Sequence, residues 1–373
     1  MSARKLCLSL PRPLVFHPHA RVFPAVHVRL AATRGTLWVG GDPHTMPTES
    51  SISDPSVVDV AVLDHDAHGI PAAEYADILD RRLPDHTVAL ARTAADRRRL
   101  LASTPVVAGK RLSASDLTDA TALRLFACNS AGVDHLPLKE LESRGVAVTN
   151  ASGVHGPNIA EHVLGWILTF VRRLDEGQRR QRRREWRRFQ SFTELAGSTV
   201  TVVGLGAIGE TIVSRLAGFD VETIGVRHSP SAGGPTDEVV GYDALLPALA
   251  ETDILVLSCP LTETTRGLID AAALEALPTD AIVVNVARGG VVDTDALVDA
   301  IRSNTIHGAA LDVTDPEPLP ESHPLWGFEN VFITPHVAGH TPKYFERRAE
   351  ILVDNLNRVA ETGTYDSLEN QIA

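Results

Sequence analysis

The chain has 373 residues, of which 44% are hydrophobic and 22% charged, and its formal net charge is −12. This composition is that of a globular protein long enough for two domains, and its apolar runs fall short of the roughly twenty residues that a membrane span needs. Three widely spaced cysteines suggest neither a metal-binding pair nor a disulfide framework, so we expect a cytoplasmic protein.

The first 45 residues differ from the rest of the chain. They hold six Lys and Arg residues but a single acid, Asp42, and their prolines interrupt any helical or strand period. They match no secretory signal, and they fit a mitochondrial presequence only weakly. We expect residues 1–45 to be either a disordered extension or a misassigned start, with Met46 as the true first residue.

The remainder of the chain is therefore more acidic than the total, and the whole sequence has only four lysines. An acidic, lysine-poor surface keeps halophilic proteins soluble in salt, although an ordinary acidic enzyme would share this charge. Both interpretations disfavour binding to nucleic acid, whose phosphates such a surface repels. We expect a halophilic protein with neither a nucleic-acid nor a membrane partner.

From residue 57 onward, apolar runs alternate with amphipathic segments. Strands are predicted near residues 58–63, 87–90, 105–107, 123–128 and 146–149, with helices between them such as 72–82 and 136–143. Buried parallel strands joined by helices produce this pattern. A helical period over residues 341–361 indicates a C-terminal helix, which we expect to pack on this first domain, made of residues 57–155 and 341–373.

A long helix is predicted from Asn158 into the mid-180s. Its tail holds nine arginines between Arg172 and Arg188, against only three acids. Such a tail is either a patch for an anionic ligand or nucleic acid, or a solvated arm that meets acids on a partner subunit. The second interpretation is preferred, because a run of charges is usually a solvated surface.

A second series of alternating elements predicts a second α/β domain over residues 156–340. Its strands are expected near 199–203, 221–226, 253–258, 281–286, 307–312 and 331–333, and its helices near 207–217, 242–250, 270–277 and 294–303. The fold class is therefore α/β, with two doubly wound parallel sheets.

A strand, a glycine-rich turn and a helix share the segment "TVTVVGLGAIGETIVSRLAG" (199–218). Gly204 permits the tight turn, Gly206 lets a pyrophosphate approach the backbone, and Gly209 lets the helix close onto the strand. Ala207 and Ile208 then supply helix N-terminal amides to the phosphate. The motif predicts a dinucleotide-binding Rossmann domain.

Arg227, His228 and Ser229 stand at the end of the next strand, where NAD-binding chains carry an acid for the ribose 2′-hydroxyl. A guanidinium instead fits a 2′-phosphate, and His228 and Ser229 add further donors. Alternatively Arg227 stacks on adenine and both dinucleotides are accepted. We expect NADP(H) to be preferred and NAD(H) to remain possible.

Four polar residues follow later strands, at the sheet edge where ligands of doubly wound folds bind. Arg288 suits the binding and polarisation of a 2-keto acid, and His336 suits proton transfer to the developing alkoxide. Glu317 would fix the imidazole tautomer and favour its protonated form. Asp312 would meet the nicotinamide end or orient backbone.

These motifs together resemble the D-isomer-specific 2-hydroxyacid dehydrogenases over residues 57–365. The resemblance rests on "VVGLGAIG", "CPLTETTRGLI", "VNVARGGVVD", "AALDVTDPEPLP" and "ITPHVAG". It implies a flavodoxin-like substrate-binding domain, completed by the C-terminal helix, around a central coenzyme domain. It also implies that Arg288, Glu317 and His336 are catalytic, that Asp312 contacts the nicotinamide, and that the long helix forms a homodimer.

The resemblance extends the predicted site. Backbone amides of the loop "SAGVDHL" would bind the substrate carboxylate at Ser130, Ala131 and Gly132, together with Arg288. The residues expected to bind the cofactor are Gly204, Gly206, Ala207, Ile208, Gly209, Arg227, His228, Ser229, Cys259, Pro260, Thr265, Ala287, Asp312, His336 and Gly339. No metal site is expected.

A glyoxylate/hydroxypyruvate or broad 2-keto acid reductase fits this pattern best. Glu317 argues against the formate dehydrogenases, which resemble this chain but carry glutamine there, and the segment "DHDAHGI" (64–70) is expected to select the substrate side chain. The alternative from another class is a dinucleotide-sensing corepressor-like binding protein, which would bind cofactor but reduce keto acids very slowly.

Overall fold

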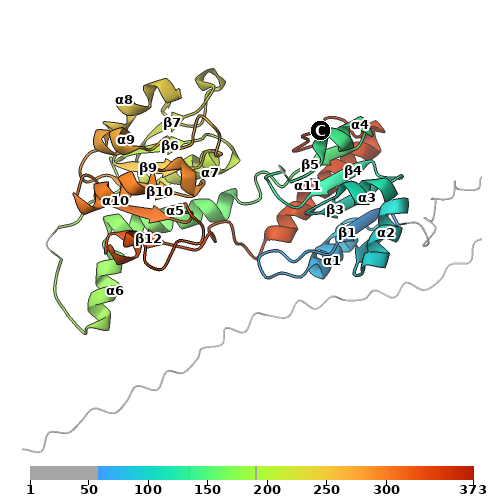
Figure 1. The fold of residues 1–373 in the computed structure, drawn as a ribbon, viewed down its shortest axis with the longest axis horizontal. Helices are drawn as coiled ribbons and strands as arrows, with labels where there is room; N and C mark the ends of the chain where they lie inside the picture. The colour runs from blue at the N-terminus through green and yellow to red at the C-terminus, as the bar shows by residue number, and fades with distance from the viewer. Residues whose placement is uncertain (1–57, 134, 190) are drawn as a thin grey trace, which may run out of the picture. The chain divides into compact units, whose positions relative to one another are not determined.

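The computed structural model describes residues 58–133, 135–189 and 191–373, so the expectation for residues 1–45 lies outside the described residues. Figure 1 shows two lobes, each built on one parallel sheet with helices on both faces. Among the described residues, no helix is both long and apolar enough to cross a membrane.

The first lobe contains a five-stranded parallel sheet in the order β2-β1-β3-β4-β5. Its strands are β1 (Val60–Leu63), β2 (Val88–Ala91), β3 (Val106–Gly109), β4 (Leu125–Cys128) and β5 (Ala147–Thr149). Its helices are α1 (Ala72–Arg82), α2 (Ala94–Ser103), α3 (Ala114–Asp119), α4 (Leu138–Ser143) and α11 (Tyr344–Thr362). This strand order is the flavodoxin-like one.

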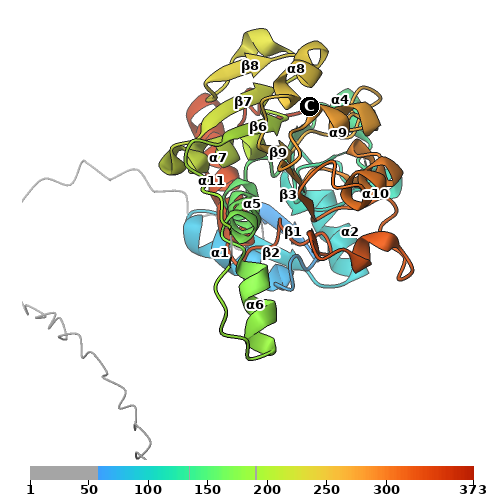
Figure 2. The ribbon, with the colours of Figure 1, turned by 90° about the vertical axis from the view of Figure 1, so that its left-hand side faces the viewer.

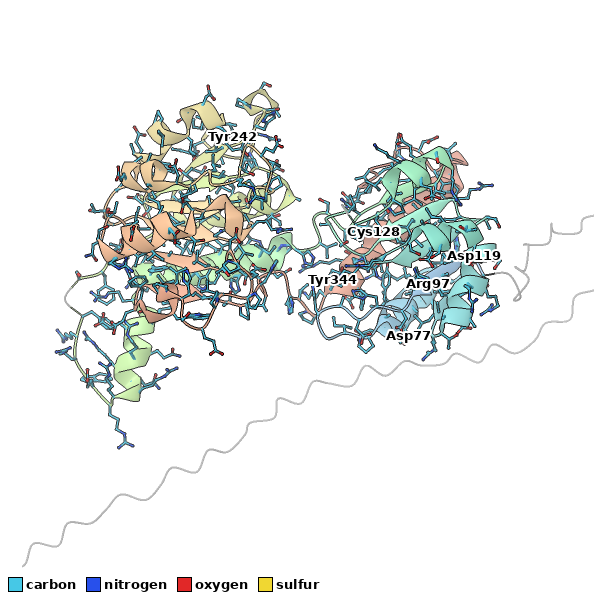
Figure 3. All side chains as sticks on the ribbon, in the orientation of Figure 1. Asp77, Arg97, Asp119, Cys128, Tyr242 and Tyr344 are labelled. Carbon is cyan, nitrogen blue, oxygen red and sulfur yellow. The ribbon has the colours of Figure 1, made fainter. Side chains whose placement is uncertain are left out.

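The C-terminal helix α11 packs in the first lobe, although more than 180 residues separate it from β5. Its apolar face, which includes Phe345, Ala349 and Leu352, joins the same core cluster as Tyr75 and Leu79 of α1. Figure 3 shows Tyr344, at the start of α11, and Cys128, at the end of β4, in this lobe. The apolar residues that predicted a helix at 341–361 are therefore the ones that α11 buries in the first lobe.

The second lobe contains a seven-stranded parallel sheet in the order β12-β11-β10-β9-β6-β7-β8. Its strands are β6 (Thr199–Val203), β7 (Glu222–Val226), β8 (Glu238–Val240), β9 (Ile254–Leu257), β10 (Ile282–Asn285), β11 (Gly308–Leu311) and β12 (Val331–Ile333). The order reverses between β6 and β9, which is the switch point of a Rossmann fold. The predicted fold class is therefore confirmed.

Helices cover both faces of this sheet. They are α5 (Gly156–Val171), α6 (Leu174–Arg182), α7 (Ala207–Leu216), α8 (Leu245–Leu249), α9 (Ala271–Ala276) and α10 (Thr294–Arg302). Short 3₁₀ turns are η1 (Ala217–Phe219), η2 (Pro230–Ala232), η3 (Tyr242–Ala244), η4 (Gly289–Val291) and η5 (Pro324–Gly327). The predicted helix at 242–250 is thus a 3₁₀ turn followed by a short α-helix, and β8 was not predicted.

The prediction of one long helix from Asn158 into the mid-180s is wrong. The helix α5 ends at Val171, and α6 begins at Leu174 after Arg173, whose backbone is left-handed (φ 50°). The apolar residues through which α5 packs on the sheet have no counterpart in α6, which has no buried residue. Tertiary packing therefore does not extend α5 into one longer helix. Figures 1 and 2 show α6 projecting from the second lobe.

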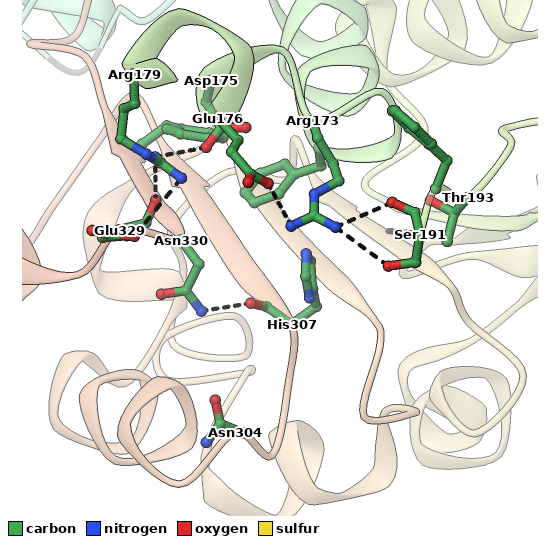
Figure 4. Close-up of a pocket in the computed structure, with 13 residues that line it drawn as sticks. Arg173, Asp175, Glu176, Arg179, Ser191, Thr193, Asn304, His307, Glu329 and Asn330 are labelled. Carbon is green, nitrogen blue, oxygen red and sulfur yellow. Dashed lines mark hydrogen bonds and ion pairs between the residues drawn. The ribbon is translucent and has the colours of Figure 1, made fainter. Parts of the chain in front are cut away.

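We call α6 and the segment that returns from it, residues 172–189 and 191–192, the arm. Several of its arginines pair within it: Arg179 lies 2.8 Å from Asp175, and Arg180 contacts Glu176 and covers the Phe189 ring at 4.6 Å. Arg179 also reaches Glu329, just before β12, across the hollow drawn in Figure 4. Much of the arginine charge thus stabilises the arm.

Candidate active site

The second sheet aligns its strand ends in register. Val203 of β6 is paired with Val226 of β7 and with Leu257 of β9, which in turn pairs with Asn285 of β10. Asn285 pairs with Leu311 of β11, and that residue pairs with Ile333 of β12. The residues that follow these ends are Gly204, Arg227, Cys259, Ala287, Asp312 and Thr334. Most of the sites predicted in this lobe therefore lie along one edge of one sheet.

The glycine turn after β6 fits a dinucleotide phosphate. Gly204 has φ +99°, and a Cβ there would lie 2.5 Å from the backbone nitrogen of Cys259. A Cβ on Gly209 would collide with the Gly204 carbonyl, whereas a Cβ on Gly206 would meet no atom within 4 Å. Gly204 and Gly209 are therefore required by the fold, and Gly206 faces the open space that a pyrophosphate would fill.

Replacing Gly206 by alanine separates binding from folding. Gly206 has φ −110°, which alanine adopts freely, so Gly206→Ala is expected to fold with an unchanged melting temperature. Its methyl group would occupy the phosphate approach, and we expect the Kd of NADPH to rise about ten- to hundredfold. Gly218→Ala, also in open space but after α7, is the matched control and should bind as wild type. Equal Kd values for both variants would contradict this placement of the pyrophosphate.

Arg227 lies directly after β7 with its side chain 25% exposed. Its Nη1 donates a hydrogen bond to the Gly233 carbonyl at 2.6 Å and lies 3.9 Å from the Glu210 carboxylate of α7. His228 and Ser229 next to it are exposed. The guanidinium therefore lies at the end of β7 with one acid nearby, and its contact with a ribose or a 2′-phosphate stays a prediction.

The loop that follows β9 is held in place by two buried side chains. Cys259 is buried against Gly204, and burial raises the pKa of its thiol to about 11, so the sulfur is a neutral packing group. Thr265 is also buried; its hydroxyl donates to the Pro260 carbonyl and accepts from the Thr262 amide. The side chain of Thr265 thus fixes the loop, and its contact with a cofactor stays a prediction.

Two of the predicted catalytic side chains are in contact. His336 Nδ1 lies 3.1 Å from Glu317 Oε2, and the other carboxylate oxygen accepts the Thr314 amide at 3.1 Å. Glu317 therefore holds the imidazole through Nδ1, and both side chains are about half exposed. With Nδ1 so engaged, Nε2 is the ring nitrogen left to exchange a proton with a ligand.

Asp312 holds the backbone around His336. His336 has a left-handed backbone (φ 55°), which a non-glycine residue adopts at a cost of about 1–3 kcal/mol unless its surroundings impose it. The Asp312 carbonyl accepts the His336 amide at 2.8 Å, and its buried carboxylate accepts the amides of Val337 and Ala338, both at 2.9 Å. Of the two predicted roles for Asp312, orienting backbone is the one these contacts perform.

One face of α5 holds the same loop, and sequence reasoning missed it. His155 Nδ1 bonds to the Gly339 carbonyl, Asn158 donates to the Ala338 carbonyl, and His162 Nε2 lies 3.2 Å from the Thr334 hydroxyl. Because that hydroxyl donates its proton to Asp312, the His162 nitrogen must donate. The sequence does contain a pattern that indicates this face, because His155, Asn158 and His162 are spaced three and four residues apart along an apolar helix.

Arg288 lies just beyond β10 and is exposed. Its Nη1 donates to the Ala287 carbonyl at 2.6 Å, and the buried Asn285 side chain donates to the Arg288 carbonyl. The structure places Arg288 at the end of the strand that neighbours the Asp312 strand, but no contact joins it to the Glu317–His336 pair. Beside that pair lies a hollow of about 400 Å³ whose apolar wall includes Leu319, Trp326 and Ile333.

The predicted carboxylate loop lies in the first lobe, after β4. Ser130 Oγ donates to the Gly132 carbonyl at 2.8 Å, and Asn150 donates to the Ala131 carbonyl at 2.9 Å. Both carbonyls are thus hydrogen-bonded within the lobe, and residues Ala131 and Gly132 are exposed. An exposed loop whose carbonyls are engaged is suited to binding an anion through its backbone amides.

Comparisons with known proteins identify the family of the chain. Residues 164–338 match the profile described as "D-isomer specific 2-hydroxyacid dehydrogenase, NAD binding domain". A glyoxylate reductase of Thermofilum pendens is 36% identical over 270 residues, which are 70% of this chain and 79% of that protein.

Two solved structures are similar along most of the chain. A D-isomer specific 2-hydroxyacid dehydrogenase from Xanthobacter autotrophicus Py2, in complex with NADPH and MES, is 28% identical, with a TM-score of 0.68 and coverage of 85% of this chain and 98% of that one. An NADPH-dependent glyoxylate/hydroxypyruvate reductase from Sinorhizobium meliloti, in complex with NADP and malonate, is 27% identical, with a TM-score of 0.63 and coverage of 84% and 97%.

The chain belongs to the D-isomer specific 2-hydroxyacid dehydrogenase family, as its motifs predicted. It is an oxidoreductase that uses a nicotinamide dinucleotide, and its homologues support keto acid reduction, so the corepressor-like alternative is not favoured.

Proposed function

We propose that this chain reduces small 2-keto acids to 2-hydroxy acids, with glyoxylate and hydroxypyruvate as the first candidates. We also propose that the product has the D configuration wherever C2 is a stereocentre. The observation that carries the proposal is the contact between His336 and Glu317 at the carboxyl edge of a Rossmann sheet. The names of relatives that reduce glyoxylate and hydroxypyruvate support the choice of substrate.

We assign the following roles to the residues of the site. The bound nicotinamide supplies the hydride. Arg288 holds the substrate carboxylate and polarises the carbonyl, aided by the backbone amides of Ala131 and Gly132. His336 gives the Nε2 proton to the developing alkoxide, and Glu317 stabilises the imidazolium through Nδ1. Asp312 keeps the imidazole in place through the backbone, and its contact with the nicotinamide end stays a prediction.

We propose NADPH as the preferred cofactor, because Arg227 offers a cation to a 2′-phosphate where NAD-binding chains have an acid. We also assign residues 57–155 and 341–373 to the substrate-binding domain and residues 156–340 to the dinucleotide-binding domain. The flavodoxin-like and Rossmann strand orders of the two lobes support this division.

We further propose that the arm docks on a second copy of this chain. The arm presents fully exposed Trp186 and half-exposed Phe192 and Leu174 beside its arginines, and the rest of the chain is acidic. Light scattering is expected to give a particle of two chains, and Trp186→Ala is expected to shift it towards one chain. A wild-type particle of one chain would contradict this dimer.

Steady-state assays with glyoxylate, hydroxypyruvate, pyruvate and 2-ketoisocaproate test the reaction, with NADPH and NADH in parallel at low and molar salt. We expect turnover of glyoxylate, hydroxypyruvate or both with NADPH, and higher activity in molar salt if the acidic surface is a halophilic adaptation. Cofactor binding without turnover of any keto acid would contradict the proposed function.

A further inference from the structure

Arg348, on α11 in the first lobe, is a buried cation whose contacts are all with neutral groups. Its side chain is 4% exposed, and its Nη2 donates to the Asn129 amide oxygen and to the Tyr75 hydroxyl. Its Nη1 is buried with no hydrogen-bond partner. Among the described residues, no carboxylate lies within ion-pair distance of it. A buried charge without an opposite charge destabilises a fold.

Aromatic rings offset part of this cost but do not cancel the charge. The Arg348 guanidinium carbon lies 4.4 Å from the Tyr75 ring centre, 5.4 Å from that of Tyr344 and 5.9 Å from that of Phe345. Burial raises the pKa of both the Tyr75 and Tyr344 hydroxyls, so neither is an anion near neutral pH. The positive charge of Arg348 therefore stays uncompensated inside the lobe.

The group that Arg348 contacts leads directly into the carboxylate loop. Asn129 follows β4 and precedes Ser130, and it is fixed at three atoms: its amide donates to the Gly109 carbonyl, its carbonyl accepts from the Tyr344 hydroxyl, and its side-chain oxygen accepts from Arg348. The exposed residues Ala131 and Gly132 follow Ser130 in the chain. An uncompensated cation that contacts the residue preceding such a loop makes its surroundings attractive to an anion.

The substrate itself does not reach Arg348. The hollow beside the guanidinium, lined by Tyr75, Cys128 and Asn150 among others, has a volume of about 10 Å³, which is room for one water at most. Any effect of Arg348 on a ligand must therefore pass through its electric field and through Asn129.

We propose that Arg348 is a positioning residue for the substrate carboxylate, retained for anion binding at the expense of stability. Through Asn129 it holds the loop 130–132 in place, and its charge lowers the free energy of an anion bound there. The assignment of the substrate carboxylate to this loop rests on the proposed function.

Two substitutions remove the field in different ways. Arg348→Met deletes the charge and keeps an apolar chain of similar length, whereas Asn129→Asp keeps the shape and places a carboxylate against the guanidinium. We expect each to weaken the binding of oxamate to the NADPH-saturated protein about tenfold and to raise the KM for glyoxylate by a similar factor, with kcat and the Kd of NADPH unchanged. Arg358→Met, on the exposed face of α11, is the matched control and should behave as wild type.

Stability distinguishes this role from a structural one. We expect the melting temperature to stay the same or rise in both variants, because a buried unpaired charge is removed or paired. Unchanged oxamate binding in Asn129→Asp or Arg348→Met overturns the proposal, and so does a fall in melting temperature with loss of NADPH binding. If oxamate binding weakens as expected but no keto acid is reduced by wild type, the proposed function fails and the role of Arg348 stands.

Discussion

His336→Asn is expected to reduce kcat/KM for glyoxylate by about 10²–10⁴-fold, which is the usual contribution of a positioned general acid. Asparagine tolerates the left-handed backbone that His336 adopts, so the loop held by Asp312 should keep its conformation. The Kd of NADPH should therefore stay within about twofold of the wild-type value, and the melting temperature should stay within about one or two degrees. Stopped-flow kinetics and fluorescence titration measure these quantities.

A paired substitution in the same loop tests the partner of His336. Glu317→Gln retains the hydrogen-bonding shape but removes the charge that stabilises the imidazolium, so kcat/KM for glyoxylate should fall about tenfold or more. Glu321→Gln, a neighbouring exposed glutamate, should leave kcat/KM unchanged. Equal kcat/KM values for all three proteins would show that Glu317 does not support proton transfer.

Arg227→Asp is expected to reverse the choice of cofactor. Wild type should favour NADPH over NADH by tenfold or more in kcat/KM, because two unit charges about 4 Å apart at a surface are worth on the order of 4 kcal/mol before desolvation. Aspartate removes this attraction, repels a 2′-phosphate and accepts the ribose hydroxyl of NADH. The ratio of the two kcat/KM values measures the effect, and it should fall below one in the variant.

Substitutions at two residues of α7 serve as controls for the Arg227→Asp experiment. Arg215→Asp makes the same charge change in the exposed last turn of α7 and should leave the ratio unaltered. Glu210 lies 3.9 Å from Arg227, so Glu210→Gln should raise the preference for NADPH severalfold by removing an acid from the phosphate site. A wild type that prefers NADH would contradict the assignment of Arg227 to a 2′-phosphate.

The sequence predicted those features that depend on local pattern. Strands such as Ile282–Asn285 are continuous apolar runs, and the structure buries them on both faces. Gly204 and Gly209 have the surroundings that the predicted tight turn and close helix packing require, whereas the pyrophosphate role of Gly206 stays a prediction. Glu317 and His336 were paired from their chemistry at the strand ends, and they are in contact.

Features that depend on tertiary partners were missed. The break at Arg173 arises because α6 loses the apolar face that buries α5, which an arginine-rich helical pattern does not reveal. His162 is important only because Thr334 and Asp312 lie opposite it. Arg348 stands in a helix where arginine is an ordinary surface residue, and only the packing of α11 against α1 and Asn129 makes it a buried cation.

The central claim is a hydride transfer from NADPH to the C2 atom of a 2-keto acid, with a D-hydroxy acid as product. It is tested most directly by reducing pyruvate or hydroxypyruvate with 4R- and 4S-deuterated NADPH in separate reactions. The account predicts a D-2-hydroxy acid that carries deuterium at C2 with one of the two labels. An L product, or a product without deuterium from either label, would contradict it.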